Sequence, residues 1–490
     1  MMLVKESRSI GLVYGQIAQS NADFPALIRE AMVLNHGEFW QLVRAMAFRM
    51  RALGVTNNSL IALNTHDMFI SLGVLFASSL LGSRLVVASK VLAHAQTVQP
   101  THFFRSFEAV GSKLVEFREI DESWFPNERT KSLPDDFPGT PDPESDWLYL
   151  HTSGTTGKPK FIALSERMVR DRTLAVSSDF PFRKTTFASV FNYTSRPFYA
   201  RAIGTLLNAG SIVDSEELNF WVKSGVNLVC GAPGQVTALL NGQVISPRLP
   251  RLEVSGAKLL PGAAEAFLES FEQVVDVYGA GETNKTFANI ICRDSEGHIF
   301  KTGKHLDSIV EIVSADGKLC SPGSIGSVRV KNDYTAKEYL RAPELSAKSF
   351  RDGWFYPGDL ATWGENGELI VLSREDDVIN LGGYKINATL LDLLFASVEG
   401  IREAIVFNNP KPSVEDRILI FVVYERDVDR GKLVAEVCRL AQAKIGVVLM
   451  PRCVRSIDAI PRTQSGEPDR LSCENLVRQR AGLFDEPEQP

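Results

Sequence analysis

A segment rich in glycine, hydroxyl groups and lysine has the composition of a binding site for phosphates. It reads LHTSGTTGKPKFIALS and spans residues 150–165. Gly154 and Gly157 let the backbone turn its amides toward an anion, the hydroxyls add donors, and Lys158 adds a positive charge. The loop therefore suits a polyphosphate. A P-loop is excluded, because only two residues separate the glycines and Pro159 stands where that motif has Ser or Thr.

The elements around this loop must fix its two ends. Apolar runs before and after it predict that strands hold both ends. Upstream, helical and strand patterns alternate, which is typical of a layered, largely parallel sheet. The patterns predict strands over 147–150 and 161–164, a helix over 38–53, a strand over 60–65, a buried helix over 68–82 and a strand over 85–89.

The second half of the chain has a different pattern of apolar and polar residues. Residues 309–332 alternate apolar and polar positions around D-G and P-G turns, which predicts a β-rich subdomain. From about residue 377, short strands mix with helical stretches. We therefore expect an α/β fold, in which a large N-terminal domain of layered α/β lobes plus a β-rich subdomain precedes a small C-terminal α+β domain.

Composition narrows the class of protein. A chain of 490 residues is long enough for two or more domains, and its net charge of −6 argues against a general nucleic-acid binder. The six cysteines are scattered, which indicates reduced thiols and a cytoplasmic protein, and the seven histidines form no metal-binding cluster. We see no signal peptide, and the apolar run at 68–82 is shorter than a membrane span.

Three later segments also carry residues of types that could bind a ligand. VYGAGETN (277–284) has a G-x-G, but it lacks the third glycine of a dinucleotide fingerprint. In DGWFYPGDLA (352–361), Asp359 follows a Pro-Gly turn. A turn of this kind can position a carboxylate so that it accepts hydrogen bonds from two hydroxyl groups. In SREDDVINLGGYKI (373–386), Gly382 and Gly383 allow the backbone to approach a ligand closely.

Taken in order, these motifs resemble those of the adenylate-forming (ANL) superfamily. That superfamily contains acyl- and aryl-CoA synthetases, adenylation domains of peptide synthetases and firefly-type luciferases. The resemblance covers most of the chain and implies an enzyme, an AMP-forming acid–thiol ligase. A small-molecule carboxylic acid would attack the α-phosphorus of ATP while pyrophosphate leaves, with Mg2+ present. The acyl group would then pass to the thiol of coenzyme A or of a carrier-protein phosphopantetheine, and both acceptors stay open.

The resemblance also implies roles for individual residues. The phosphate loop would grip the β- and γ-phosphates, Tyr278 would stack on adenine, and Glu282 would hold the magnesium ion. Asp359 and Arg374 would bind the ribose. Gly281 replaces a threonine that touches the α-phosphate in the family, so one donor is missing. The nucleotide-binding set is Thr152, Ser153, Gly154, Thr155, Thr156, Gly157, Lys158, Tyr278, Gly279, Asp359, Arg374 and Lys385.

A division of the chain follows from the same resemblance. Asp376 matches the family's hinge, so the large AMP-binding domain would span 1–375 and the small mobile domain 376–490. The strip with Gly382 and Gly383 would line the thiol channel after the small domain rotates. A hinge suits a two-step reaction, because one active site is rebuilt for the second chemistry.

The acid pocket is expected to involve two further segments, 191–210 and 254–267. Asn192-Tyr193 and Gly256-Ala257 are similar to segments of aryl-acid-activating enzymes, and Ala280 completes the predicted substrate contacts. No aspartate is visible near Asn192 to pair an amino-acid substrate. An aromatic or similar apolar acid is therefore slightly favoured over a fatty acid, although the aromatic residues here also suit a core.

One catalytic position departs from the family. The family has a lysine near its C-terminus that bridges the substrate carboxylate and the α-phosphate, whereas PRTQSGEPDR (461–470) places Glu467 there. At about 4 Å and an effective dielectric of about 20, a unit charge pair is worth about 4 kcal/mol. The catalytic set of Lys158, Glu282 and Glu467 thus includes a residue that weakens adenylation, unless Arg462 or Lys444 substitutes. The alternative is a degenerate member that binds nucleotide or acyl-adenylate without full ligase activity.

Overall fold

The structure is a computed structural model that describes residues 9–87, 98–106, 117–127, 136–140, 142–152, 160–177, 184–381, 384–410, 417–446, 448–462 and 468–479. The chain forms two compact units whose segments are interleaved in sequence. Unit 1 comprises Met1–Glu311, Arg329–Pro357 and Asn366–Glu368. Unit 2 comprises Ile312–Val328, Gly358–Glu365 and Leu369–Pro490. The expected hinge at Asp376 stays a prediction.

Unit 1 contains a six-stranded sheet that fixes the ends of the phosphate loop. Its order is β6-β5-β3-β4-β7-β8, and only the β7–β8 pair is antiparallel. The loop joins β7 to β8, so the prediction of strands on both sides is confirmed. The strands are β3 (Leu60–Asn64), β4 (Arg84–Val87), β5 (His102–Arg105), β6 (Arg118–Glu119), β7 (Asp146–Thr152) and β8 (Lys160–Ser165).

A second, nine-stranded sheet in unit 1 has the order β15-β14-β13-β12-β11-β9-β10-β1-β2. The pairs from β1 through β13 are parallel, and antiparallel strands complete both edges. The strands are β1 (Pro25–Arg29), β2 (Met32–Asn35), β9 (Thr186–Ser189), β10 (Ser211–Val213), β11 (Leu228–Gly231), β12 (Leu249–Val254), β13 (Phe271–Ala280), β14 (Asn284–Arg293) and β15 (Ile299–His305).

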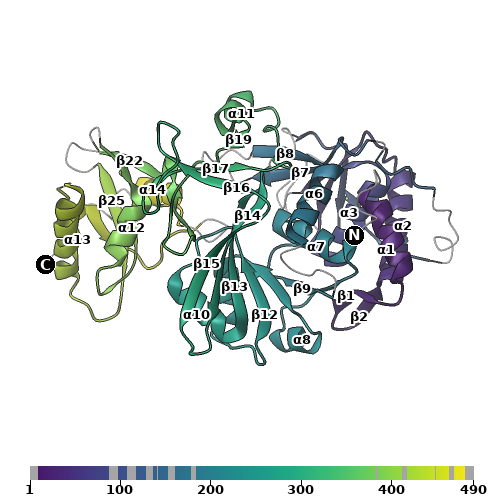
Figure 1. The fold of residues 1–490 in the computed structure, drawn as a ribbon, viewed down its shortest axis with the longest axis horizontal. Coiled ribbons are helices and arrows are strands. Elements are labelled where there is room, and N and C mark those ends of the chain that lie inside the picture. Colours follow the sequence, from purple (N-terminus) through teal and green to yellow (C-terminus); the bar gives the residue numbers. More distant parts are fainter. Residues whose placement is uncertain are drawn as a thin grey trace. The chain divides into compact units, whose positions relative to one another are not determined.

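Helices pack on both sheets and between them. Helix α6 contacts β7 and β8 of the first sheet, α7 contacts β9 and β10 of the second, and the two helices pack on each other (Figure 1). The apolar stretch at 68–82 forms α3, whose residues are all buried, so the predicted buried helix is confirmed. The helices are α1 (Ile10–Ser20), α2 (His36–Ala52), α3 (Met68–Leu80), α6 (Glu166–Ser177), α7 (Arg196–Leu207), α8 (Leu218–Lys223), α9 (Pro233–Leu240), α10 (Pro261–Ser270) and α11 (Pro343–Ser349), with a short 3-10 turn, η3 (Glu122–Trp124).

Unit 2 is built around a small sheet of β24, β25 and β26, covered on both faces. Val406 and Ile420 face a core shared with α12 and α13, whereas Phe407 and Phe421 face a second core with Cys473 of α14. This alternation is expected for a sheet buried on both sides. The elements are β20 (Asp359–Trp363), β21 (Leu369–Arg374), η4 (Glu375–Asp377), β22 (Val378–Leu381), β23 (Tyr384–Asn387), α12 (Ala388–Ala396), β24 (Ile401–Asn408), β25 (Ile418–Tyr424), α13 (Arg430–Ile445), η5 (Pro451–Cys453), β26 (Val454–Ser456) and α14 (Arg470–Gln479).

The predicted β-rich segment is also present. β16 (Ile309–Val313) and β17 (Gly326–Lys331) occupy it, and the boundary between the units falls within both strands. In unit 1, β18 (Phe350–Arg351) pairs with β19 (Trp354–Phe355). Within the described ranges, every helix is too short or too polar to cross a membrane.

Candidate functional site

The phosphate loop itself, 153–159, lies outside the described residues, but its two ends are well defined. Thr152 pairs with Lys160 across the antiparallel β7–β8 ladder. The ends therefore meet at one edge of the sheet, as a loop that wraps an anion requires. The predicted ligands Ser153, Gly154, Thr155, Thr156, Gly157 and Lys158 remain predictions.

The VYGAGETN segment forms the tip of the β13–β14 hairpin. The pairing register shifts between Tyr278 and Gly279, and a Cβ at Gly279 would lie 2.1 Å from the Asn284 carbonyl oxygen. Only glycine fits this close approach of the two strands. The bulge places the half-buried Tyr278 ring just before the turn that carries Glu282.

Glu282 is 5% exposed, and its position is fixed by several hydrogen bonds. Its carboxylate Oε1 accepts a hydrogen bond of 2.7 Å from the Tyr339 hydroxyl. Its main-chain carbonyl accepts from the Ala336 amide at 2.8 Å and from Arg172 at 2.6 Å. The Tyr339 bond orients the carboxylate, and the main-chain bonds fix the turn that carries it.

Tyr339 connects Glu282 to the end of the phosphate loop. Lys160 Nζ lies 5.0 Å from the centre of the Tyr339 ring, and the Leu340 amide donates to the Phe161 carbonyl at 2.7 Å. The segment 339–340 therefore binds the start of β8 and the Glu282 carboxylate together. Sequence reasoning missed Tyr339, because nothing in its local sequence signals a contact 57 residues away.

Arg172 of α6 is a second residue that sequence reasoning missed. Its guanidinium is buried and donates to the carbonyls of Gly281, Glu282 and Tyr334. Burial lowers the pKa of Arg172 to about 9, and nearby Arg196 contributes to the shift. Arg172 thus fixes the turn of the β13–β14 hairpin through its backbone carbonyls. Nothing in the sequence indicated this role, because Arg172 is one charged residue within a helical pattern.

The predicted acid-pocket residues are placed in different settings. The Asn192 side-chain oxygen accepts from the backbone amide and hydroxyl of Thr194, so it closes a local turn. The Tyr193 hydroxyl donates to Asp214 at 2.6 Å, and Asp214 in turn pairs with Arg29. Burial and the Asp214 charge raise the pKa of Tyr193 well above its usual range.

Gly256 and Ala257 follow β12, at the carboxyl end of a parallel strand. Gly256 has a φ of +88°, and an added Cβ would meet nothing within 4 Å. Ligands of open α/β sheets bind at this edge. Ala280 lies at the end of neighbouring β13, and its carbonyl accepts from Arg196 at 3.1 Å.

A cavity of about 30 Å³ lies in unit 1 beside this hairpin. Its apolar wall comes from β7, β8, α6 and α7. Four cationic side chains and Asn284 also line the cavity. The cationic residues are Arg172, Arg196, Arg201 and Lys285.

Unit 2 brings together the two predicted ribose ligands. Asp359 opens β20 directly opposite Arg374 in β21, and their side chains form an ion pair of 2.7 Å. Asp359 is 8% exposed, while about a third of the Arg374 side chain is exposed. Gly358 has a φ of +81°, so the turn before Asp359 needs the predicted glycine.

The remaining predictions in unit 2 fall on residues that are described only in part or not at all. Gly382, Gly383 and Glu467 lie outside the described residues, and the side chains of Asp376 and Lys385 lie outside them as well. Of the two candidate substitutes for a catalytic lysine, Arg462 forms an ion pair with Glu403 and Lys444 is exposed in the last turn of α13.

No cluster of three or more His, Cys, Asp or Glu side chains suited to a metal occurs in the part of the chain that the structure describes. Among the described residues, Glu282 is therefore not part of such a cluster. One carboxylate is compatible with Mg2+, because this ion is commonly held by one or two carboxylates together with substrate phosphates.

Family models match most of the chain in two blocks. The model of the AMP-binding enzyme family matches residues 15–340, and the model of the AMP-binding enzyme C-terminal domain matches residues 393–467. The chain belongs to the AMP-binding enzyme family. The resemblance to the adenylate-forming superfamily is thereby confirmed.

Two of the related sequences are named as enzymes that act on aromatic acids. Salicylyl-CoA synthase / salicylate adenylyltransferase of a Streptomyces species is 27% identical over 68% of this chain, and the match spans 63% of that protein, less than two thirds of its length. The 3-hydroxybenzoate–CoA ligase of Aromatoleum is 22% identical over 94% of this chain and 95% of its own.

Solved structures of AMP-binding enzymes share this fold. The o-succinylbenzoate coenzyme A synthetase of Bacillus subtilis, in complex with AMP, has a TM-score of 0.76 at 19% identity and covers 94% of this chain and 97% of its own. ATP-bound MatB of Rhodopseudomonas palustris has a TM-score of 0.77 at 19% identity, covering 96% and 99%. The predicted fold class is confirmed.

Proposed function

We propose that this chain is an AMP-forming acid–thiol ligase that activates a carboxylic acid with ATP and transfers the acyl group to coenzyme A. The observation that carries the proposal is the link between Glu282, Tyr339 and the base of the phosphate loop, in a member of the AMP-binding enzyme family. This link joins a preorganised carboxylate to a loop composed for phosphates.

In the first step, the loop at 153–158 would bind the departing phosphates and Tyr278 would stack on adenine. Glu282 would hold Mg2+, and the bound ion would neutralise negative charge on the phosphates. Asp359 would accept hydrogen bonds from the ribose hydroxyls, and Arg374 would donate hydrogen bonds to them. Fixing the acid and ATP in line provides most of the rate, because the transition state needs positioning and charge stabilisation.

In the second step, the thiol would attack the acyl carbonyl and AMP would leave. The glycines at 382 and 383 would let the backbone approach the thiol arm. Coenzyme A is favoured as the acceptor, because relatives similar over nearly the whole chain are named CoA ligases. A carrier protein is the less favoured acceptor, supported by a 25% identical match to 8% of gramicidin S synthase 2 of Aneurinibacillus migulanus.

An aromatic acid is the favoured substrate. The names of relatives support it, since they include ligases of 3-hydroxybenzoate and of a substituted naphthoate.

The test separates the two half-reactions. Acid-dependent pyrophosphate exchange measures adenylation, and thioester formation from synthetic acyl-adenylate and coenzyme A measures transfer. We expect thioester formation in the native chain. Absence of both reactions over a panel of aryl and fatty acids would leave only the degenerate, ligand-binding alternative.

The variant Glu467→Lys tests whether adenylation is weakened. Restoring a cation where the family has one should raise pyrophosphate exchange by about tenfold or more, because repulsion of the substrate carboxylate becomes attraction. Glu467→Gln, which removes only the repulsion, should give an intermediate rate. Native exchange equal to that of Glu467→Lys would show that Glu467 does not limit the first step.

A further inference from the structure

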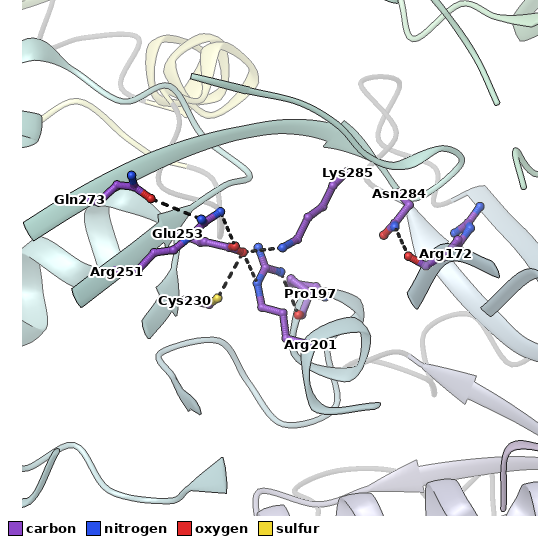
Figure 2. Close-up of polar contacts among 9 residues, drawn as sticks. All are labelled: Arg172, Pro197, Arg201, Cys230, Arg251, Glu253, Gln273, Asn284 and Lys285. Atoms are coloured by element: carbon purple, nitrogen blue, oxygen red, sulfur yellow. Dashed lines mark hydrogen bonds and ion pairs between the residues drawn. The ribbon is translucent and has the colours of Figure 1, made fainter. Parts of the chain in front are cut away.

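A buried carboxylate links the elements on either side of the hairpin turn that carries Glu282. Glu253 of β12 is 2% exposed, and three cationic side chains converge on its carboxylate (Figure 2). They are Arg201 of α7 at 3.0 Å, Lys285 of β14 at 2.5 Å and Arg251 of β12 itself at 3.2 Å. Burial alone would raise the pKa of the Glu253 carboxyl, but these cations hold it well below its usual range, so Glu253 is ionised.

Lys285 connects this carboxylate to one end of the hairpin turn. It lies near the start of β14, three residues after Glu282, and its backbone is paired with Gly279 across the β13–β14 ladder. The two strands are so close here that a Cβ at Gly279 would lie 3.0 Å from the Lys285 Cα. The bond from Lys285 to Glu253 therefore holds the turn at the point where the chain enters β14.

Helix α7 holds the other end of the same turn. Arg196, in the first turn of α7, donates to the carbonyl of Ala280, the last residue of β13, at 3.1 Å. Arg201, farther along the same helix, reaches Glu253 and through it Lys285. Both ends of the turn are thus attached to α7, one of them directly and the other through the Glu253 carboxylate.

The energetics of such a network favour a role in geometry over a role in stability. Desolvation of buried charges offsets much of their attraction, so buried ion pairs add little to the free energy of unfolding compared with apolar packing. Charge-assisted hydrogen bonds nevertheless restrict the distance and the direction between the groups that they join. We therefore expect the bonds of Glu253 to fix where the turn lies.

We propose that Glu253 is a positioning residue, which acts through Lys285 and Arg201 to hold the turn that carries Glu282 in place against α7. This inference rests on the proposed ligase function and adds residues that affect the first half-reaction from outside the ligand-binding set. Position matters at this scale, because a displacement of about 1 Å from a distant mutation can cost about 100-fold in rate.

Lys285→Met tests the proposal in the full chain. It removes the cation and keeps an unbranched side chain, while Glu253 retains Arg201 and Arg251 as partners. We expect kcat for acid-dependent pyrophosphate exchange to fall by about tenfold or more. The KM for ATP should stay within about threefold of native, because the contacts to adenine and ribose are retained. Lys285→Arg, which restores a cation, should recover most of kcat.

Arg251→Met is the matched control. It also removes one cation from the Glu253 carboxylate, but Arg251 contacts that carboxylate from the same strand, β12. Its kcat should stay within about twofold of native, a change of less than 1 kcal/mol in the barrier. Arg201→Met, which releases α7 from Glu253, replaces Lys285→Met if that variant does not fold, and its kcat should fall in the same way.

Hydrogen–deuterium exchange of the backbone amides at 280–286 reports the position of the turn without any turnover. We expect faster exchange there in Lys285→Met than in the native chain or in Arg251→Met, because one attachment of the turn is lost. Urea denaturation of all variants shows which of them are fully folded under the assay conditions.

The outcomes separate this inference from the proposed function. Native kcat in Lys285→Met, or an equal loss in Arg251→Met, would overturn the inference and leave the ligase intact. A selective loss of kcat without faster amide exchange would also overturn it, because Lys285 would then act on the ligands and not on the turn. If the native chain forms neither product, the ligase proposal fails and amide exchange alone decides. Faster exchange in Lys285→Met than in Arg251→Met would then support the positioning role, and equal exchange would overturn it.

Discussion

At the scale of single residues, Glu282 is the best-defined member of the candidate site. Its carboxylate is buried, accepts a hydrogen bond from Tyr339 and belongs to a turn fixed by Arg172. If it holds the magnesium ion, its charge matters more than its shape. That distinction can be tested with isosteric changes.

Glu282→Gln keeps the shape of the side chain and removes its charge. We expect acid-dependent pyrophosphate exchange to fall by about 100-fold, the size of effect seen when one charge-stabilising group is removed from an active site. Raising the magnesium concentration should recover part of the loss.

Tyr339→Phe is the matched control for this change. It removes the hydroxyl that orients Glu282 and leaves the charge in place, so exchange should fall by about tenfold or less. If the two variants lose activity equally and neither responds to magnesium, Glu282 has a structural role instead of a metal-binding one.

At the scale of elements, α6 begins at Glu166, a buried residue that connects three parts of unit 1. Its carboxyl accepts hydrogen bonds from the Ile10 amide at the start of α1 and from the Thr140 hydroxyl. Burial raises the pKa of Glu166 from 4.5 to about 7 despite these bonds. The folded state therefore binds this proton more tightly than the unfolded chain does.

This shift predicts a pH dependence of stability. The contribution of the protonated carboxyl is fully present below pH 4.5 and is lost as the pH rises through about 7. It amounts to about 3 kcal/mol over that window. Glu166→Gln, which is neutral throughout, should unfold with a free energy that falls less between pH 5 and pH 7.5, as measured by urea denaturation. Parallel curves for the two proteins would contradict the raised pKa.

The sequence predicted elements better than it predicted contacts. The helix expected over 38–53 is α2, the helix over 68–82 is α3, and strands flank the phosphate loop, because apolar periodicity is a local property. Tyr339, Arg172 and the other cationic side chains that line the cavity were not predicted. Each depends on side chains far apart in the sequence, and Lys285 gives no local sign that it meets Glu253 in a buried space.

At the scale of the whole molecule, we expected the two domains to be divided at a single residue, whereas the segments of the two compact units alternate along the chain. The chain passes between the compact units within β16 and β17, and for the last time between Glu368 and Leu369. The order of the motifs predicted a domain boundary near Asp376. Family motifs indicate functional positions, whereas the compact units are defined by contacts between residues. Whether the proposed reaction uses a hinge at Asp376 is therefore open to a direct test.

Asp376→Pro tests the predicted hinge. Proline fixes φ near −65° and removes the backbone donor, so it restricts rotation at this position. If Asp376 is the hinge, adenylation should stay within about twofold of native, while thioester formation should fall by about tenfold or more because only the second step requires the rotation. Asp376→Ala is the control, since it removes the carboxylate and leaves the backbone free. If proline leaves both half-reactions unchanged, the moving joint lies elsewhere, and the crossing at Glu368–Leu369 becomes the next position to restrict.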